Sequence, residues 1–364
     1  MRSCLDPIGV PALPASITDG ESNSFLFPIA AVLPKTYSLV SEMHKRASQD
    51  LSASAQTTDS IGTRVPLDTA WLVGIIPLDF VPREIDISHD GKLLYVAHSD
   101  GRIVSVIDIA TLSTVQQIHD CGGAALKVSP DGARLYTLGK RQCYVIDTAT
   151  HEVIDTIPSR GVNRIVCSSN GRFLGLSFTH SPDGLIRLVD RYDYACENDF
   201  DLGTLADTSL VLGISPDSTL IYATVLGDDD TTAVSVIDTT DYSQTDIPGF
   251  RNPRSLVTSP DGYFIYAGGR NGVYFADAIT QSMFCVVELG HPGYPVDVVG
   301  ITPDGRHVYA VHGCEGDLYR VDTYDRKSVC VASLPAASGS VLSADGTRLY
   351  TTHSDLQWVS VYAL

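Results

Sequence analysis

The stretch Ser259-Pro260-Asp261-Gly262-Tyr263-Phe264-Ile265-Tyr266 decides the fold, because close copies of it return along the chain. Each copy starts with a tetrapeptide similar to Ser-Pro-Asp-Gly. Seven residues after the start stands a tyrosine in every copy but the third, which has Gly175. About twenty residues after the start, the first six copies place an aspartate behind an apolar residue. The starts lie about 42 residues apart and are Ser88, Ser129, Ser168, Ser215, Ser259, Thr302 and Ser343.

Each part of the copy predicts a local structure. An apolar, β-prone segment such as Val298–Ile301 precedes the tetrapeptide, whose proline and glycine favour a tight reversal into a second strand. A third strand such as Val104–Ile107 follows, and the aspartate then turns the chain into a fourth. Four antiparallel strands in about 42 residues are typical of one β-propeller blade.

The seventh copy provides only three strands before Leu364. The segment Trp71–Pro77 resembles the fourth strands of other blades and ends in the same apolar-Pro pair as Ile157-Pro158. We therefore predict an all-β, seven-bladed β-propeller of four-stranded antiparallel blades over residues 70–364. An N-terminal strand completes the last blade and protects its edge. Residues 1–69 carry no repeat and are expected to be a leader, partly disordered or packed on the ring.

The segments Tyr95-Val96-Ala97-His98 and Val104-Ser105-Val106-Ile107-Asp108 resemble the YVTN β-propeller repeat family, and the resemblance covers about residues 70–364. Its wider superfamily includes bacterial phosphogluconolactonase-like propellers. The resemblance implies a seven-bladed ring that acts as a binding module. The phosphogluconolactonase-like branch implies, as an alternative, a lactonase-like hydrolase or lyase, although its catalytic residues cannot be matched one by one here.

The composition excludes several classes of partner. The chain has 25 Lys and Arg against 43 Asp and Glu, a net charge of −18, which disfavours nucleic acid and anionic membrane surfaces. We expect no membrane span, because no apolar run reaches about 18 residues. The apolar segment 22–34 contains Pro28 and is not a clear secretory signal, so a cytoplasmic location is slightly favoured. Eight cysteines without a C-x-x-C pair are expected to be free thiols in a monomer.

The repeat register also places a candidate site. First strands start, and second strands end, at the same mouth of the ring. His98, His312 and His353 end the second strands of blades one, six and seven, which are consecutive around a closed ring. The same mouth receives four charged residues from the starts of first strands and one histidine from a loop, namely Arg83, Glu84, Arg254, Asp297 and His291.

Three interpretations of the histidines remain open. In the first, they finish strands by bonding to loop backbone, the role of the Asn in the YVTN pattern. In the second, they line a small-molecule or anion pocket. In the third, they bind a divalent metal, the one cofactor considered, although second strands of neighbouring blades lie roughly 10 Å apart, so all three rings would have to lean inward.

The sequence thus predicts a non-catalytic recognition propeller that binds a protein or small-molecule ligand at this mouth. In the enzyme alternative, His312 or His353 acts as a base and Arg83 or Arg254 holds an anionic substrate. We also expect Asp86 and Lys127, in the same slot of neighbouring blades, to form a structural ion pair. The acidic loop 227–232 is expected to be solvated.

Overall fold

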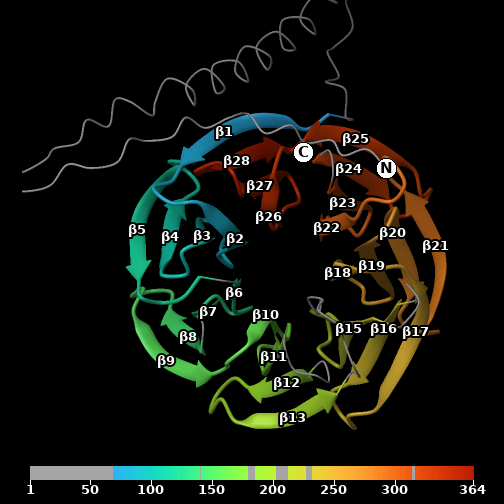
Figure 1. Cartoon of the computed structure of the whole chain (residues 1–364), viewed down its shortest axis with the longest axis horizontal. Helices are drawn as coiled ribbons and strands as arrows, with labels where there is room; N and C mark the ends of the chain where they lie inside the picture. Colours follow the sequence, from blue (N-terminus) through green and yellow to red (C-terminus); the bar gives the residue numbers. More distant parts are fainter. Residues whose placement is uncertain are drawn as a thin grey trace, which may run out of the picture. The chain divides into compact units, whose positions relative to one another are not determined.

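The computed structural model describes residues 69–123, 125–139, 141–178, 185–201, 212–226, 232–313 and 316–364. Within these ranges the chain forms 28 strands in seven four-stranded antiparallel sheets and no helix, which confirms the predicted all-β propeller. The sheets stand in a ring around a central axis (Figure 1), and the words channel and mouth refer below to this axis and to the end of the ring where the first strands begin. No helix in these ranges could cross a membrane. The predicted leader, except Thr69, and the acidic loop 227–231 lie outside the described residues.

Blades one to six each consist of four consecutive strands, ordered from the channel outward. Blades one to three comprise β2 (Pro82–Ile87), β3 (Leu93–His98), β4 (Ile103–Asp108), β5 (Ser113–His119), β6 (Leu126–Val128), β7 (Arg134–Leu138), β8 (Gln142–Asp147), β9 (Val153–Pro158), β10 (Val162–Cys167), β11 (Phe173–Phe178), β12 (Leu185–Asp190) and β13 (Cys196–Asp201). Blades four to six comprise β14 (Leu212–Ile214), β15 (Leu220–Leu226), β16 (Thr232–Asp238), β17 (Gln244–Phe250), β18 (Ser255–Thr258), β19 (Phe264–Gly269), β20 (Gly272–Asp277), β21 (Ser282–Glu288), β22 (Val296–Ile301), β23 (His307–His312), β24 (Asp317–Asp322) and β25 (Ser328–Ser333).

The seventh blade joins the two ends of the ring. Its inner strands are β26 (Ala337–Leu342), β27 (Arg348–His353) and β28 (Trp358–Ala363), and its outer strand is β1 (Trp71–Pro77). Pro77 lies opposite Trp358 in an antiparallel pairing, and Ile76 is fully buried. The blue strand β1 beside the red β28 shows the closure in Figure 1. The predicted closing strand is therefore confirmed.

The repeated tetrapeptide forms the turn that the sequence predicts. In blade five, the Ser259 hydroxyl donates to Asp261 Oδ1 at 2.5 Å and accepts the amide of Phe264 at 2.9 Å. Gly262 has a φ of +78°, which favours glycine. In blade three, Asn170 replaces the aspartate and accepts the hydroxyl of Ser168 at 2.8 Å. The turn thus needs an acceptor oxygen at this position rather than a charge.

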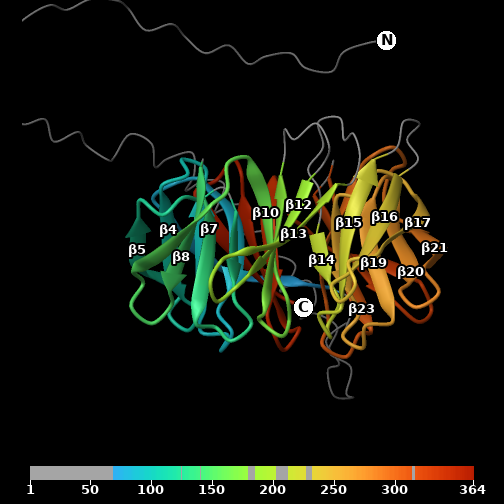
Figure 2. The same ribbon diagram turned by 90° about the horizontal axis from the view of Figure 1, so that it is seen from below.

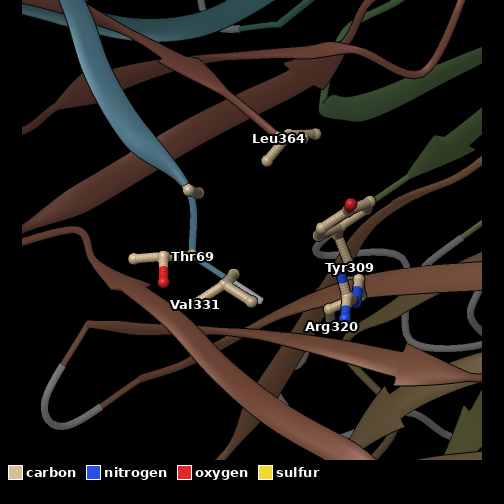
Figure 3. Close-up of a pocket in the computed structure, with 6 residues that line it drawn as sticks. Thr69, Tyr309, Arg320, Val331 and Leu364 are labelled. Carbon is tan, nitrogen blue, oxygen red and sulfur yellow. The ribbon is translucent and has the colours of Figure 1, made fainter. Parts of the chain in front are cut away.

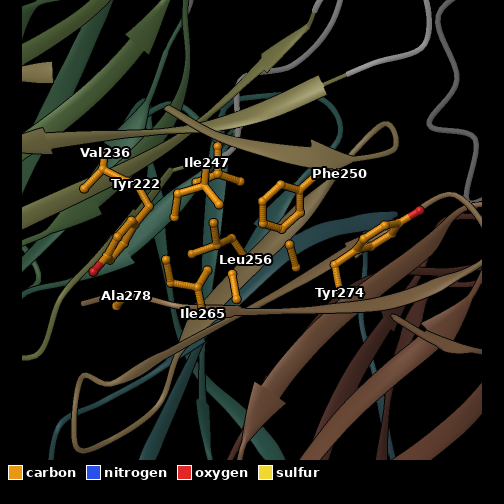
Figure 4. Close-up of a cluster of buried hydrophobic side chains, with 11 residues drawn as sticks. Tyr222, Val236, Ile247, Phe250, Leu256, Ile265, Tyr274 and Ala278 are labelled. Atoms are coloured by element: carbon orange, nitrogen blue, oxygen red, sulfur yellow. The ribbon is translucent and has the colours of Figure 1, made fainter. Parts of the chain in front are cut away.

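The hydrophobic core lies between neighbouring blades. One cluster brings Tyr222 and Ile247 of blade four against Leu256 and Ile265 of blade five (Figure 4). The tyrosine that recurs in six copies is buried in each of them. Burying one large apolar side chain contributes about 1.5–3 kcal/mol, so this residue stabilises each interface between blades.

The cysteines agree with the prediction of free thiols as far as they are described. Six lie in the described ranges, and all are free. Cys121 and Cys143 are buried, where they pack as small apolar side chains. Cys4 and Cys314 lie outside the described residues.

Candidate functional site at the channel mouth

The inner strands present charged side chains at one mouth of the channel. The strands run between the two faces of the ring (Figure 2). Three inner strands are irregular near this mouth, with register shifts between Pro82 and Ile85 in β2, between Val162 and Arg164 in β10, and between Ala337 and Gly339 in β26. A bulge re-aims the side chains around it. Arg83, Glu84 and Arg164 lie at these irregularities.

Glu84 and Arg164 form an ion pair that spans a blade. Arg164 Nη1 lies 2.9 Å from Glu84 Oε1, although the residues belong to blades three and one. The same repeat position in blade two is Ala125, which carries no charge and is buried in the hydrophobic cluster of Tyr136 and Leu138. Burial raises the pKa of Glu84, and Arg164 and Arg83 oppose this shift.

Two further ion pairs join neighbouring blades. Asp86 Oδ2 lies 2.9 Å from Lys127 Nζ and accepts the amide of Val128 at 2.9 Å, so the predicted structural pair is present. Arg254 Nε and Asp297 Oδ1 form a looser pair at 3.9 Å. Burial raises the pKa of Asp297, opposed by Arg254.

Arg83 differs from the other cations of this mouth. Its carbonyl accepts the hydroxyl of Thr352 at 2.8 Å and that of Ser338 at 3.3 Å, which fixes its backbone to blade seven. Its side chain is exposed and forms no ion pair among the described residues. The backbone of Arg83 is therefore held by blade seven, whereas its guanidinium has no ion-pair partner within the described part of the chain.

The three histidines occupy the predicted slot but belong to separate environments. His98, His312 and His353 are the last residues of β3, β23 and β27, and their exposed fractions are 0%, 0% and 1%. His98 Nε2 lies 2.8 Å from Ser105 Oγ, and His353 Nε2 lies 2.8 Å from Ser360 Oγ.

Loop carbonyls accept hydrogen bonds from His312 and His353, whereas the buried Nδ1 atoms of His98 and His312 have no hydrogen-bond partner among the described residues. His353 Nδ1 donates to the carbonyl of Pro335 at 2.7 Å. His312 Nε2 donates to the carbonyl of His291 at 3.2 Å, and the ring packs edge-on against Tyr294. Burial lowers the pKa of His98 and of His353, which favours their neutral forms.

The predicted residues thus separate into two groups. Arg83, Glu84, Arg254 and Asp297 lie at the channel mouth, whereas the three slot histidines are enclosed within their blades. The described residues contain no group of three or more His, Cys, Asp or Glu side chains that could hold a metal ion. A general base must reach the substrate, and the enclosed rings of His312 and His353 do not present such a contact. His291 is exposed, and its carbonyl accepts the hydrogen bond from His312.

A small pocket lies elsewhere in the ring, where the closing strand begins. It has space for about one water molecule and is lined by Thr69, Ala70, Tyr309, Arg320, Val331 and Leu364 (Figure 3). None of the residues predicted to bind a ligand lines it.

Together the seven sheets define a seven-bladed β-propeller, a fold that hosts both enzymes and binding modules. No family model matches the chain. It is similar to the "Uncharacterized protein YwhL" of Bacillus subtilis (strain 168), with 25% identity over 320 residues, covering 85% of this chain and 59% of that protein. It is also similar to the "Seven-bladed beta-propeller protein Rv1057" of Mycobacterium tuberculosis, with 34% identity over 110 residues, or 28% of each chain.

The chain therefore spans less than two thirds of either relative. Among solved structures, a chain of Kuenenia stuttgartiensis hydrazine synthase superposes with a TM-score of 0.66. The match covers 85% of this chain and 98% of that one at 18% identity, which is a likeness of fold alone. These relatives support the seven-bladed propeller, and membership of the YVTN family stays a prediction.

Proposed function

We propose that this propeller is a non-catalytic recognition module that binds a small ligand carrying a carboxylate or phosphate group at the channel mouth. The observation that carries the proposal is Arg83, whose exposed side chain has no ion-pair partner among the described residues, while Arg164 and Arg254 are held by carboxylates. A guanidinium can bind such a group through two parallel hydrogen bonds.

The local charge supports an anionic ligand. At this end the described inner strands, with Arg254 directly before β18, carry three cations and two carboxylates, namely Arg83, Arg164, Arg254, Glu84 and Asp297. These strand starts thus carry a slight excess of positive charge in a chain whose net charge is −18. Such a local reversal raises the concentration of small anions near the mouth.

The buried histidines favour binding over catalysis. The hydrogen bonds that the rings of His98, His312 and His353 form go to serine hydroxyls and loop carbonyls of the fold, and all three rings are buried. The exposed Arg83 is instead suited to holding a ligand.

Calorimetric titration of the full chain with citrate, succinate, inorganic phosphate and the diamine putrescine tests the proposal. We expect at least one anion to bind and putrescine not to bind. Arg83→Gln should weaken that binding about tenfold or more, the usual effect of losing a charge-assisted hydrogen bond. Arg102→Gln, an exposed arginine of blade one, is the matched control and should change binding less than twofold.

Three outcomes would contradict the proposal. The first is that no anion binds, and the second is that both arginine variants weaken binding equally. The third is hydrolysis of a simple δ-lactone by the wild-type chain that His353→Gln abolishes while the fold persists, which would favour the hydrolase alternative.

A further inference from the structure

The face opposite the proposed site carries exposed apolar side chains on two neighbouring blades. The first-to-second and third-to-fourth strand turns of every blade lie on this face. In blades four and five they are residues 215–219, 238–243, 259–263 and 277–282, which we name the blade 4–5 turn surface. Tyr242, Tyr263 and Ile279 are 38%, 53% and 70% exposed there.

Contacts between the turns make them one continuous surface. The amide of Ala278 donates to the carbonyl of Tyr263 at 2.9 Å, which joins the two turns of blade five. Thr245 donates to Gln281 at 2.8 Å between the outer strands of the two blades. On the inner side, Pro216 packs against Gly262, where an added Cβ would lie 3.4 Å from the proline ring.

The charge of this surface is uncompensated. Its four turns contain five aspartates and no lysine or arginine, the aspartates being Asp217, Asp238, Asp241, Asp261 and Asp277. Corresponding turns elsewhere on this face carry cations that pair with their aspartates. Lys92 lies 3.0 Å from Asp90, Arg134 lies 2.7 Å from Asp147, and Arg306 lies 3.2 Å from Asp322.

The five carboxylates are held in place by the turns themselves. In each of them Oδ1 accepts a hydrogen bond from its own turn. These bonds lower the pKa of Asp217, Asp238 and Asp277, so their charge persists at neutral pH. The second oxygen of each carboxylate has no ion-pair partner among the described residues.

We propose that the blade 4–5 turn surface docks a basic segment of another polypeptide. Lysine or arginine head groups would meet the aspartates, while their alkyl stems and any apolar neighbours would pack on Ile279 and the two tyrosines. The carboxylates are spread over two blades and form no cluster that could hold a metal ion within the described residues. The apolar side chains between them suit a chain that has both charge and apolar surface. This docking is independent of the anion site on the other face.

Fluorescence anisotropy of the full chain with a labelled ten-residue peptide of eight lysines and arginines and two leucines tests the proposal at low salt. The double variant Asp217→Asn, Asp261→Asn should weaken binding about tenfold, because it removes two charges at exposed sites. The turns should survive, since Asn170 fills the same position in blade three through the same hydrogen bond.

The matched control is Asp90→Asn with Asp345→Asn. It removes the same two charges from the same turn position of the adjacent blades one and seven. We expect less than a twofold change in the control and a further loss with Ile279→Ser. The proposal is overturned if the two double variants weaken binding equally, if the peptide does not bind, or if spermine binds as tightly as the peptide and Ile279→Ser has no effect.

Discussion

Glu84 of blade one and Arg164 of blade three are joined at 2.9 Å across the width of the blade between them. Blade two has the uncharged Ala125 at the corresponding repeat position, so it offers neither residue a competing ion pair there. Burial raises the pKa of Glu84 above its ordinary value of 4.5, and that of Asp297 above 3.8.

This relationship predicts the pH dependence of stability. A carboxyl group with a raised pKa binds protons more tightly in the folded chain, so the free energy of unfolding falls as pH rises from about 4.5. The variant Glu84→Gln, Asp297→Asn should lose less stability than the wild type between pH 4.5 and 7, measured by urea unfolding. Asp90→Asn is a control of opposite sign. The pKa of Asp90 is lowered to about 2, so its contribution to the free energy of unfolding is lost as pH falls below 3.8. An equal decline in wild type and double variant would contradict the prediction.

The closing strand predicts a position-specific effect on stability. Ile76→Asp places a charge at a fully buried position between β1 and the rest of blade seven, and should lower the free energy of unfolding by about 3 kcal/mol or more. Val73→Asp lies in the same strand at a position that is 52% exposed and should cost less than about 1 kcal/mol. Urea unfolding of both variants measures these losses of free energy. Similar losses in the two variants would show that β1 does not complete the blade.

The enclosed histidines predict sensitivity to acid. The pKa of His353 lies below its ordinary value of 6.5, so the unfolded chain takes up the proton first and stability is lost as pH falls below about 6.5. His353→Gln should lower the free energy of unfolding by about 1–3 kcal/mol at pH 7.5, because the bonds to Pro335 and Ser360 are disturbed. Its stability should then decline less than that of the wild type between pH 7.5 and 5. The exposed His89→Gln serves as the control and should match the wild type at both pH values.

Asp86 predicts a strong coupling between blades one and two. Asp86→Ala leaves Lys127 and the amide of Val128 without their partner and should cost about 2–4 kcal/mol. Asp155→Ala removes an exposed aspartate of the outer strand β9 and should cost less than about 1 kcal/mol. Urea unfolding of the two variants measures both losses of stability. A loss for Asp86→Ala as small as that for Asp155→Ala would mean that the ion pair does not hold the inner strands of blades one and two together.

The fold could be predicted almost completely, because each repeat carries its own turn chemistry. Ser259, Asp261 and Gly262 specify one hairpin wherever their pattern returns, and the constant spacing determines the number of blades. The pair Ile76-Pro77 then identified the closing strand. The repeat register also placed Asp86 beside Lys127, because the two residues hold the same repeat position in neighbouring blades.

The site could be predicted only in part. The register correctly placed His98 and His353 at the ends of second strands, but not the directions of their side chains. The sequence did contain an indication of these directions, because Ser105 and Ser360 lie on the neighbouring strands and form hydrogen bonds with the two rings. The bulges around Glu84 and Arg164 have no clear sequence signature, so the contact between residues of two blades that are not neighbours could not be predicted.

The pairing of β1 with β28 also sets the order of events during synthesis. Strand β1 leaves the ribosome before every other strand of the ring, and its partner leaves after all of them. Six blades consist of consecutive strands and can form as the chain emerges, whereas the last sheet waits for its most distant segment. Until then the apolar edge formed by Ile76 and its neighbours has no partner, so nascent chains stalled before β28 would be the species most prone to aggregate.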